Sequence, residues 1–143
     1  MHQQLRLPRS PRSPARARAF VAEQAALYGI DADPNTLLLL TSELVTNAVM
    51  YGEGDRLTLH VKRQGDHLRV EVEDHSEELP EPRAAGAMDE HGRGLALVAK
   101  LAQDWGAHVI RTGPSLTKVV WFVVGRGGRP SATGAATGVP ASG

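Results

Sequence analysis

The chain has 143 residues, with 16 Lys and Arg against 16 Asp and Glu, and it contains no cysteine. This length suits one domain, and a net charge of zero argues against a dedicated nucleic-acid binder, because phosphate contacts need a basic surplus. Without cysteine there can be no disulfide, thiolate zinc site or cysteine nucleophile, and the composition suits a reducing cytoplasm, where we expect the protein to be.

The neutral total hides two charged segments of opposite sign. Residues 1–18 contain five arginines and no acidic residue, whereas residues 73–90 contain seven acidic residues and one arginine. Charge that is separated along a chain in this way concerns ligands and partners more often than it concerns the fold.

The basic N-terminal segment is predicted to be extended. A Pro-Arg-Ser triplet occurs twice, at residues 8–10 and 11–13, and proline disfavours a helix at the residue before it. Leu5 and Leu7 flank an arginine, an alternation that fits a short edge strand. We therefore expect residues 1–13 to form a flexible basic arm with a short edge strand.

Two helices are predicted to follow the arm. Ser13-Pro14 and Asp33-Pro34 each supply an N-cap residue followed by a proline, which is typical of a helix start. Apolar residues then recur at helical spacing over residues 14–28 and, more clearly, over residues 34–51.

Strands dominate the rest of the folded segment. Alternating apolar residues over 55–74 predict an antiparallel hairpin. Residues 75–91 are rich in proline and acids, so we expect a long loop of the kind that often binds ligands. A helix is then predicted over 92–105, with strands over 106–112 and 117–124.

The order of these elements predicts the fold class. Strands come in hairpins rather than alternating with helices, which favours an α+β fold: a two-layer sandwich with helices on one face of a mostly antiparallel, mixed sheet. Residues 14–124 would form this domain. Residues 125–143 contain only small residues, proline, valine and two arginines, so they are expected to be a disordered tail.

Three segments carry residues suited to nucleotide chemistry. Glu43 and Asn47 lie four residues apart on the second predicted helix, where they could hold a divalent cation or simply form a solvated polar face. Asp74 ends a strand and could accept a hydrogen bond from an exocyclic amine, or it could be an ordinary turn residue. The glycines at 92–95 open a predicted helix whose amides could bind phosphate, or they could form a plain junction.

Taken together, these segments resemble the nucleotide-binding boxes of the Bergerat-fold ATPase and kinase superfamily, which includes histidine-kinase catalytic domains, gyrase and Hsp90. Residues 43–49 are similar to its N box, residues 74–76 to its first glycine box and residues 92–95 to its second. Within this superfamily the chain most resembles the small, stand-alone anti-sigma-factor serine kinases. The resemblance covers roughly residues 14–124.

The resemblance implies a role for each matching residue. Asn47 would ligate Mg²⁺ that bridges the ATP phosphates, Glu43 would act as general base toward the attacking hydroxyl, and Asp74 would bind the adenine amino group. Residues 75–91 would form the ATP lid. The implied ATP-binding set also includes Ser76, Gly92, Arg93, Gly94, Leu95 and Thr117.

The implied function is a serine/threonine protein kinase that phosphorylates an anti-anti-sigma (STAS-type) partner and, in its other state, sequesters a sigma factor. Relatives of this kind also form homodimers. The alternative is a catalytically weak or inactive partner-switching module, because residues 76–78 lack the glycines of the first box and Met50 stands where many relatives have a cation. A third hypothesis, binding of nucleic acid or membrane by the arginine-rich arm, has no aromatic platform to support it.

Overall fold

The computed structural model describes residues 1–76 and 98–125 of the chain. These residues include α1 (Ser13–Tyr28), α2 (Pro34–Tyr51) and the strands β1 (His2–Pro8), β2 (Arg56–Gln64), β3 (His67–Ser76), β4 (Asp104–Thr112) and β5 (Ser115–Gly125), and residues 98–101 are also helical.

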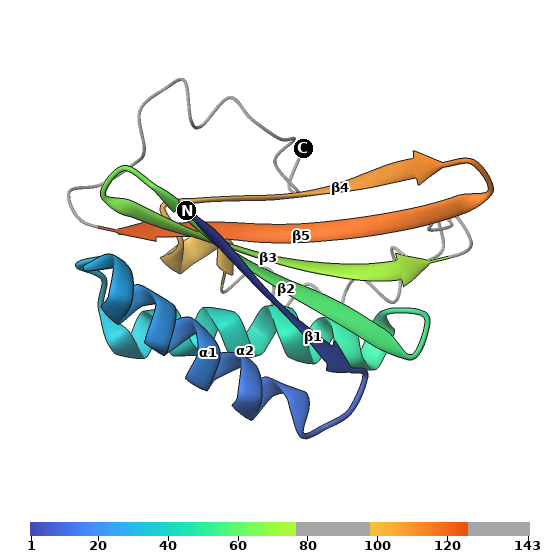
Figure 1. Ribbon diagram of the computed structural model, residues 1–143, viewed down its shortest axis with the longest axis horizontal. Coiled ribbons are helices and arrows are strands. Elements are labelled where there is room, and N and C mark those ends of the chain that lie inside the picture. Colours follow the sequence, from blue (N-terminus) through green and yellow to red (C-terminus); the bar gives the residue numbers. More distant parts are fainter. Residues whose placement is uncertain (77–97, 126–143) are drawn as a thin grey trace.

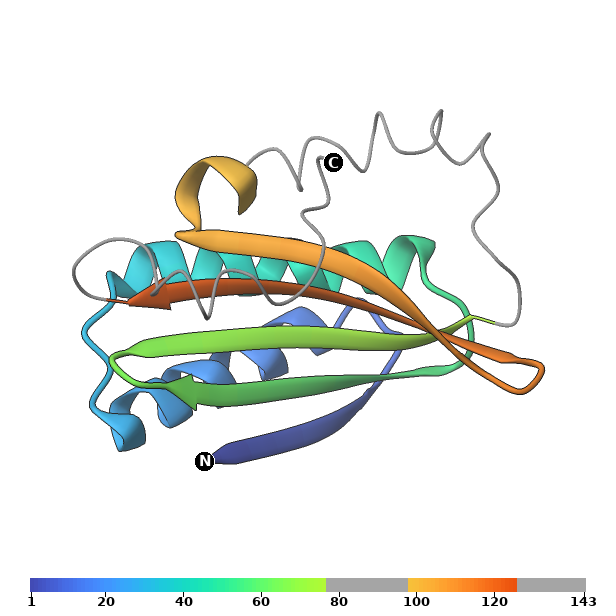
Figure 2. The same cartoon turned by 90° about the horizontal axis from the view of Figure 1, so that it is seen from above.

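The strands form one sheet with the order β1-β2-β3-β5-β4, and every neighbouring pair is antiparallel. Both helices lie side by side on one face of the sheet (Figure 1), and the view from above follows the strand order (Figure 2). This arrangement confirms the predicted α+β sandwich. The four described strand pairs include no parallel pair, so the mixed character of the sheet is not seen in this part of the chain.

The predicted N-cap is confirmed for α2 and wrong for α1. At α1 the N-cap is Arg12, which makes no side-chain cap hydrogen bond, and Ser13 is the first helical residue, whose hydroxyl donates to the Pro8 carbonyl oxygen instead. The Asp33 carboxylate accepts a hydrogen bond from the Thr36 backbone N–H at 3.1 Å, which fixes the start of α2. Gly29 ends α1 in the left-handed region, with a φ of 66°, where a residue without a Cβ carries no steric penalty.

The core lies between the helices and the sheet, and strand alternation decides which residues enter it. Every second residue of β2, β3 and β5 points toward the helices, because successive side chains of a strand alternate between faces. The buried residues that meet there from these strands are Leu57, Leu59, Val61, Leu68, Val70, Val72, Phe122 and Val124, and those from α2 are Leu37, Leu40, Leu44, Val45 and Ala48.

The other face of the sheet carries charged side chains. Lys62 Nζ lies 3.2 Å from Glu71 Oε1, and Arg69 donates a hydrogen bond to Glu71 Oε2 at 2.6 Å. The Arg69 guanidinium also lies 4.0 Å from the centre of the Trp121 ring, a distance suited to a cation–π contact. The Lys62–Glu71 pair thus links β2 to β3 on this face, and the Arg69–Trp121 contact links β3 to β5.

Two predicted boundaries are wrong. The helix expected over 92–105 ends at Leu101 in the described residues, and β4 begins at Asp104 rather than at residue 106. Trp105 pairs with Phe122 of β5 and packs against the core, so pairing with a distant strand overrides the local helical spacing. The start of that predicted helix, residues 92–97, lies outside the described residues.

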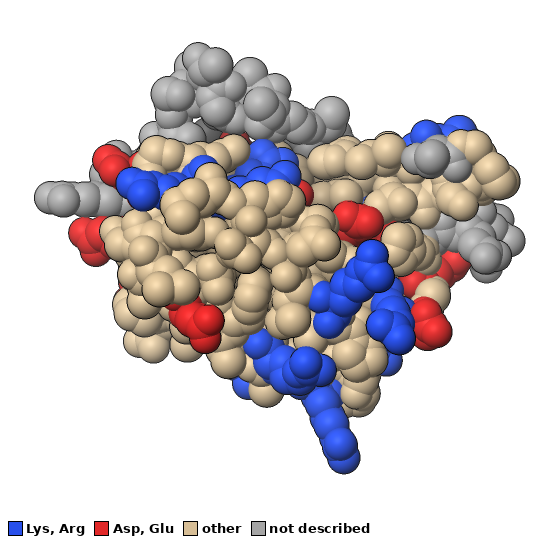
Figure 3. All heavy atoms as spheres, viewed as in Figure 1, with Lys and Arg blue, Asp and Glu red and all other residues tan. Residues whose placement is uncertain are grey.

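The basic arm contains more regular structure than the sequence indicated. β1 pairs with β2 over seven residues, His2 to Pro8, where Leu5 and Leu7 alone predicted a short strand. Lys and Arg side chains gather where β1 ends and α1 begins (Figure 3). The division of the chain into arm, domain and tail stays a prediction. Within residues 1–76 and 98–125, neither helix is long and apolar enough to cross a membrane.

Arg9 ties the end of this arm to the end of α2. Its guanidinium donates hydrogen bonds to the carbonyl oxygens of Val49 and Gly54, and its backbone N–H donates to Asp55 O at 2.9 Å. The Val49 carbonyl lies in the last turn of α2, where carbonyl groups lack helical partners and attract a positive charge.

We predict that Arg9→Ala lowers the free energy of unfolding by about 1–2 kcal/mol, because two carbonyl groups lose a charged donor. Chemical denaturation measures the change. Arg12→Ala is the matched control, since Arg12 is exposed on the same segment. Equal effects of the two substitutions would show that Arg9 has no special role.

Candidate functional site

The two polar residues predicted on the second helix do lie beside its buried stripe. Glu43 and Asn47 are half-buried and one helical turn apart, next to the buried Leu44 and Ala48 of α2. The Asn47 Nδ2 atom is inaccessible to solvent and has no hydrogen-bond partner among the residues that the structure describes. A buried amide without a partner is costly, so this position is suited to receive a ligand atom.

Asp74 supplies a second buried polar atom whose hydrogen-bonding capacity is unsatisfied in the described residues. It lies near the end of β3, opposite Leu57 of β2 and Lys118 of β5, and only 2% of it is exposed. Because it alternates with Val72 and Val70, its carboxylate faces the helices rather than the charged face. Asp74 Oδ2 lies 3.6 Å from Lys118 Nζ, whereas Oδ1 is buried and accepts no hydrogen bond within residues 1–76 and 98–125.

The surroundings of Asp74 raise the pKa of its carboxyl above the ordinary aspartate value. Burial is the largest cause, and Lys118 opposes it by favouring the ionised form. Glu53 raises the pKa further, and His75 lowers it slightly. Asp74 is thus a carboxyl whose charge is costly to keep within the fold, a property common at functional sites.

Gly52 joins α2 to this carboxylate. It follows the last helical residue, and a Cβ at this position would lie 2.8 Å from Asp74 Oδ2 and closer still to the Ala48 carbonyl oxygen. The φ of Gly52 is −74°, so close packing rather than an unusual backbone conformation requires glycine here. The contact of Gly52 with Asp74 depends on the tertiary fold, so spacing along the chain does not reveal it.

The site therefore offers two kinds of recognition on one side of the sheet. Asp74 Oδ1 can accept a hydrogen bond from an amine. Rotation of the Asn47 carboxamide exchanges its oxygen and nitrogen, so the unpartnered position can present a donor to phosphate or an oxygen ligand to Mg²⁺. By their chemistry the two groups suit the two parts of a magnesium–nucleotide complex, Asp74 an amine of the base and Asn47 the phosphates with Mg²⁺. Among the described residues, no group of three His, Asp or Glu side chains could hold a metal ion by itself.

Comparison with known protein families agrees with this geometry. Residues 32–127 match the family described as histidine kinase-, DNA gyrase B- and HSP90-like ATPases. The chain belongs to this ATPase family. No curated protein matches the chain. Membership of an ATPase family supports ATP binding by this domain, and the matched segment runs from α2 to β5, which includes Glu43, Asn47 and Asp74.

Of the other residues predicted to bind ATP, one points away from Asp74 and the rest are partly or wholly outside the described residues. Thr117 lies opposite His75, one residue along β5 from Lys118, so its side chain points to the other face of the sheet from Asp74. Lys118, which the sequence did not single out, takes the place beside the carboxylate. The backbone of Ser76 ends β3 opposite Leu116, while its side chain lies outside the described part. Gly92, Arg93, Gly94, Leu95 and the predicted lid beyond Ser76 also lie outside the described residues.

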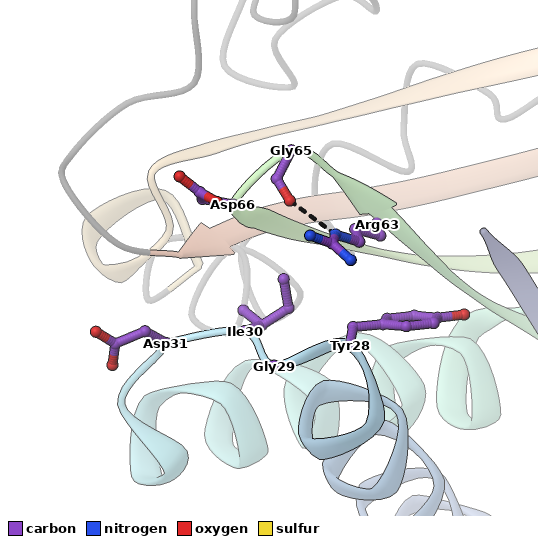
Figure 4. A pocket seen from close by; sticks show the side chains of 7 residues that line it. All are labelled: Tyr28, Gly29, Ile30, Asp31, Arg63, Gly65 and Asp66. Carbon is purple, nitrogen blue, oxygen red and sulfur yellow. Dashed lines mark hydrogen bonds between the residues drawn. The ribbon is translucent and has the colours of Figure 1, made fainter.

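A cleft of about 110 Å³ lies at the far end of the sheet from Asp74. It is bounded by the end of α1 and the turn between β2 and β3, where Arg63 donates a hydrogen bond to Gly65 O at 3.0 Å (Figure 4). Asp74 is the seventh residue after His67 along β3, which corresponds to about 23 Å of strand. The cleft contains none of the predicted ATP-binding residues; its lining residues are Tyr28, Gly29, Ile30, Asp31, Arg63, Gly65 and Asp66.

We predict that Asp74→Asn raises the free energy of unfolding at pH 7 by about 1 kcal/mol while it removes ATP binding. A carboxyl with a raised pKa in the folded state opposes folding increasingly as the pH rises from its unfolded to its folded pKa. The increase in unfolding free energy caused by Asp74→Asn should therefore shrink as the pH falls through the range in which carboxyl groups titrate. Thermal unfolding between pH 4 and pH 8 measures it.

Asp66→Asn is the control for this effect, since Asp66 is exposed in the turn between β2 and β3 and its removal relieves no burial. A loss of stability in Asp74→Asn at pH 7 would contradict the account of Asp74 as a costly buried charge.

We also predict that Gly52→Ala lowers stability by about 1–3 kcal/mol and weakens ATP binding, because the new methyl group displaces the Asp74 carboxylate. Gly65→Ala provides the comparison: it strains a backbone with a φ of 61° but contacts nothing. Calorimetric titration with ATP separates the two, since only Gly52→Ala should change the affinity. Unaltered affinity in Gly52→Ala would rule out the proposed packing role.

Proposed function

We propose that the protein is a Mg²⁺-dependent, ATP-binding serine/threonine kinase of the anti-sigma-factor type. The observation that supports it is the pair of buried, unpartnered polar atoms, Asp74 Oδ1 and Asn47 Nδ2, on two elements of an ATPase-family fold. One suits the amino group of adenine and the other suits the magnesium-bound phosphates.

Each residue of the site then has a distinct task. Asp74 accepts a hydrogen bond from the adenine amine and so orients the base. Asn47 would hold Mg²⁺, which would supply charge neutralisation at the phosphates. Glu43, one turn earlier on α2, accepts the proton of the attacking serine hydroxyl. Lys118, which pairs with the oxygen of Asp74 that the base does not use, keeps that carboxylate in place.

The proposed protein substrate is an anti-anti-sigma protein of the STAS type, phosphorylated on a serine, and the proposed second partner is a sigma factor. Both come from the resemblance of residues 42–49 and 91–98 to anti-sigma-factor serine kinases. The same proposal includes a homodimer of this chain that binds these partners in the cytoplasm.

A second candidate function is a partner-switching module that binds its partners without phosphate transfer. One observation favours it: Met50, one turn after Asn47, is 63% exposed and places an apolar side chain where a cation would help to bind phosphate. Partner binding unaffected by ATP and by Glu43→Ala would support this module and count against the kinase.

We predict that Asn47→Ala reduces the affinity for ATP about tenfold or more in the presence of Mg²⁺ and much less in its absence. Calorimetric titration with ATP and ADP, with and without Mg²⁺, measures both effects. Asn35→Ala is the matched control, because Asn35 is exposed in the first turn of the same helix. If the unaltered protein binds neither nucleotide, ATP binding by this chain is refuted.

We predict that Glu43→Gln lowers the rate of phosphate transfer from Mg-ATP to a STAS-type protein about 100-fold or more and leaves ATP affinity nearly unchanged, because only proton acceptance is lost. Glu23→Gln on the exposed side of α1 serves as the control. Transfer of labelled phosphate is the measurement. ATP binding without transfer in the unaltered protein would select the switching module instead.

A further inference from the structure

Lys118 is the cation that lies beside the base-binding carboxylate. Its Nζ is 3.6 Å from Asp74 Oδ2, and the two residues are directly opposite each other on β5 and β3. The Lys118 side chain is 25% exposed, whereas that of Asp74 is 3% exposed. The lysine thus reaches from the edge of the site toward a carboxylate that has almost no contact with water.

This pairing leaves the two oxygens of Asp74 with different tasks. Oδ2 faces Lys118, and Oδ1 is buried without any hydrogen-bond partner. An ionised carboxylate can only accept hydrogen bonds, whereas a protonated carboxyl can also donate one. A ligand group at Oδ1 must therefore be a hydrogen-bond donor when Asp74 is ionised, whereas it can be an acceptor when Asp74 is protonated.

The other charged groups around Asp74 do not replace the lysine. Glu53, which follows Gly52 after α2, disfavours the ionised carboxylate, and His75, the next residue of β3, favours it only weakly. Leu57, opposite Asp74 on the β2 side, is apolar and fully buried. Within the described part of the chain, Lys118 is consequently the main group that supports a negative charge at this position.

We propose that Lys118 determines the choice of nucleobase, by holding Asp74 as an ionised acceptor that binds a 6-amino purine and rejects a 6-oxo purine. The inference rests on the proposed ATP site and adds a specificity-determining residue to it. Without Lys118, Asp74 takes up a proton at a higher pH, and the neutral acid can donate a hydrogen bond to a 6-oxo group. A site that presents the wrong hydrogen-bonding group to a base discriminates strongly against it.

The test compares ATP with inosine triphosphate, which differs from ATP by a 6-oxo group in place of the amine. Affinities are measured calorimetrically with Mg²⁺ at pH 6 and pH 8 for the unaltered protein, Lys118→Met and Lys118→Arg. We expect the unaltered protein to prefer ATP at both pH values. In Lys118→Met the preference should fall about tenfold at pH 6 and less at pH 8. Lys118→Arg, which restores the positive charge, should recover it.

Lys62→Met is the matched control. It removes a lysine of β2 that pairs with Glu71 on the opposite face of the sheet, so it should leave the preference unchanged. Thermal unfolding of each variant checks that the fold is intact.

A carboxyl titration of Asp74 by NMR, without nucleotide, provides an independent measurement. Lys118→Met should raise the pKa of Asp74 and Lys118→Arg should restore it. If ATP binds and Lys118→Met keeps the same preference at both pH values, the inference is overturned while ATP binding stands. If neither nucleotide binds the unaltered protein, the ATP site and its base selection both fail, and the titration still decides whether Lys118 supports the charge.

Discussion

The burial of one carboxylate, that of Asp74, governs the arrangement of this site. A carboxylate that is 2% exposed carries a desolvation cost, which raises its pKa, and the fold offsets only part of that cost through Lys118. Gly52 lets α2 approach the carboxylate because a side chain at that position would collide with it. Among the described residues, Asp74 Oδ1 has no hydrogen-bond partner. Such an arrangement is understandable when a ligand supplies the missing hydrogen bond.

Local patterns predicted most of the fold. Prolines near the helix starts and helical spacing placed α1 and α2, although the N-cap of α1 is Arg12 rather than Ser13, and alternation placed the β2–β3 hairpin. The boundary between the predicted third helix and β4 was wrong, because Trp105 is positioned by its pairing with Phe122 of a strand further along the chain. Spacing within a single segment contains no information about such a pairing.

The same difference between spacing within a segment and pairing of distant strands explains which site contacts the sequence predicted and which it did not. Glu43 and Asn47 are neighbours through the helix itself, so their spacing alone brought them together. The contact of Asp74 with Lys118 depends on the register between β3 and β5, and a shift of one residue would place Thr117 beside the carboxylate instead. The importance of Gly52 likewise comes from what packs against it, which its position in the sequence does not show. The family match adds the nucleotide that these groups suit.

The central claim is that Asp74 is a buried, ionised acceptor for the amine of a nucleotide base. The most direct measurement is the pKa of the Asp74 carboxyl, followed by ¹³C NMR in the free protein and in protein saturated with Mg-ATP. The account predicts a pKa above the ordinary aspartate value in the free protein and a lower pKa with ATP bound, because a donor at Oδ1 favours the ionised form. An ordinary pKa in the free protein, or a pKa that ATP leaves unchanged, would contradict it.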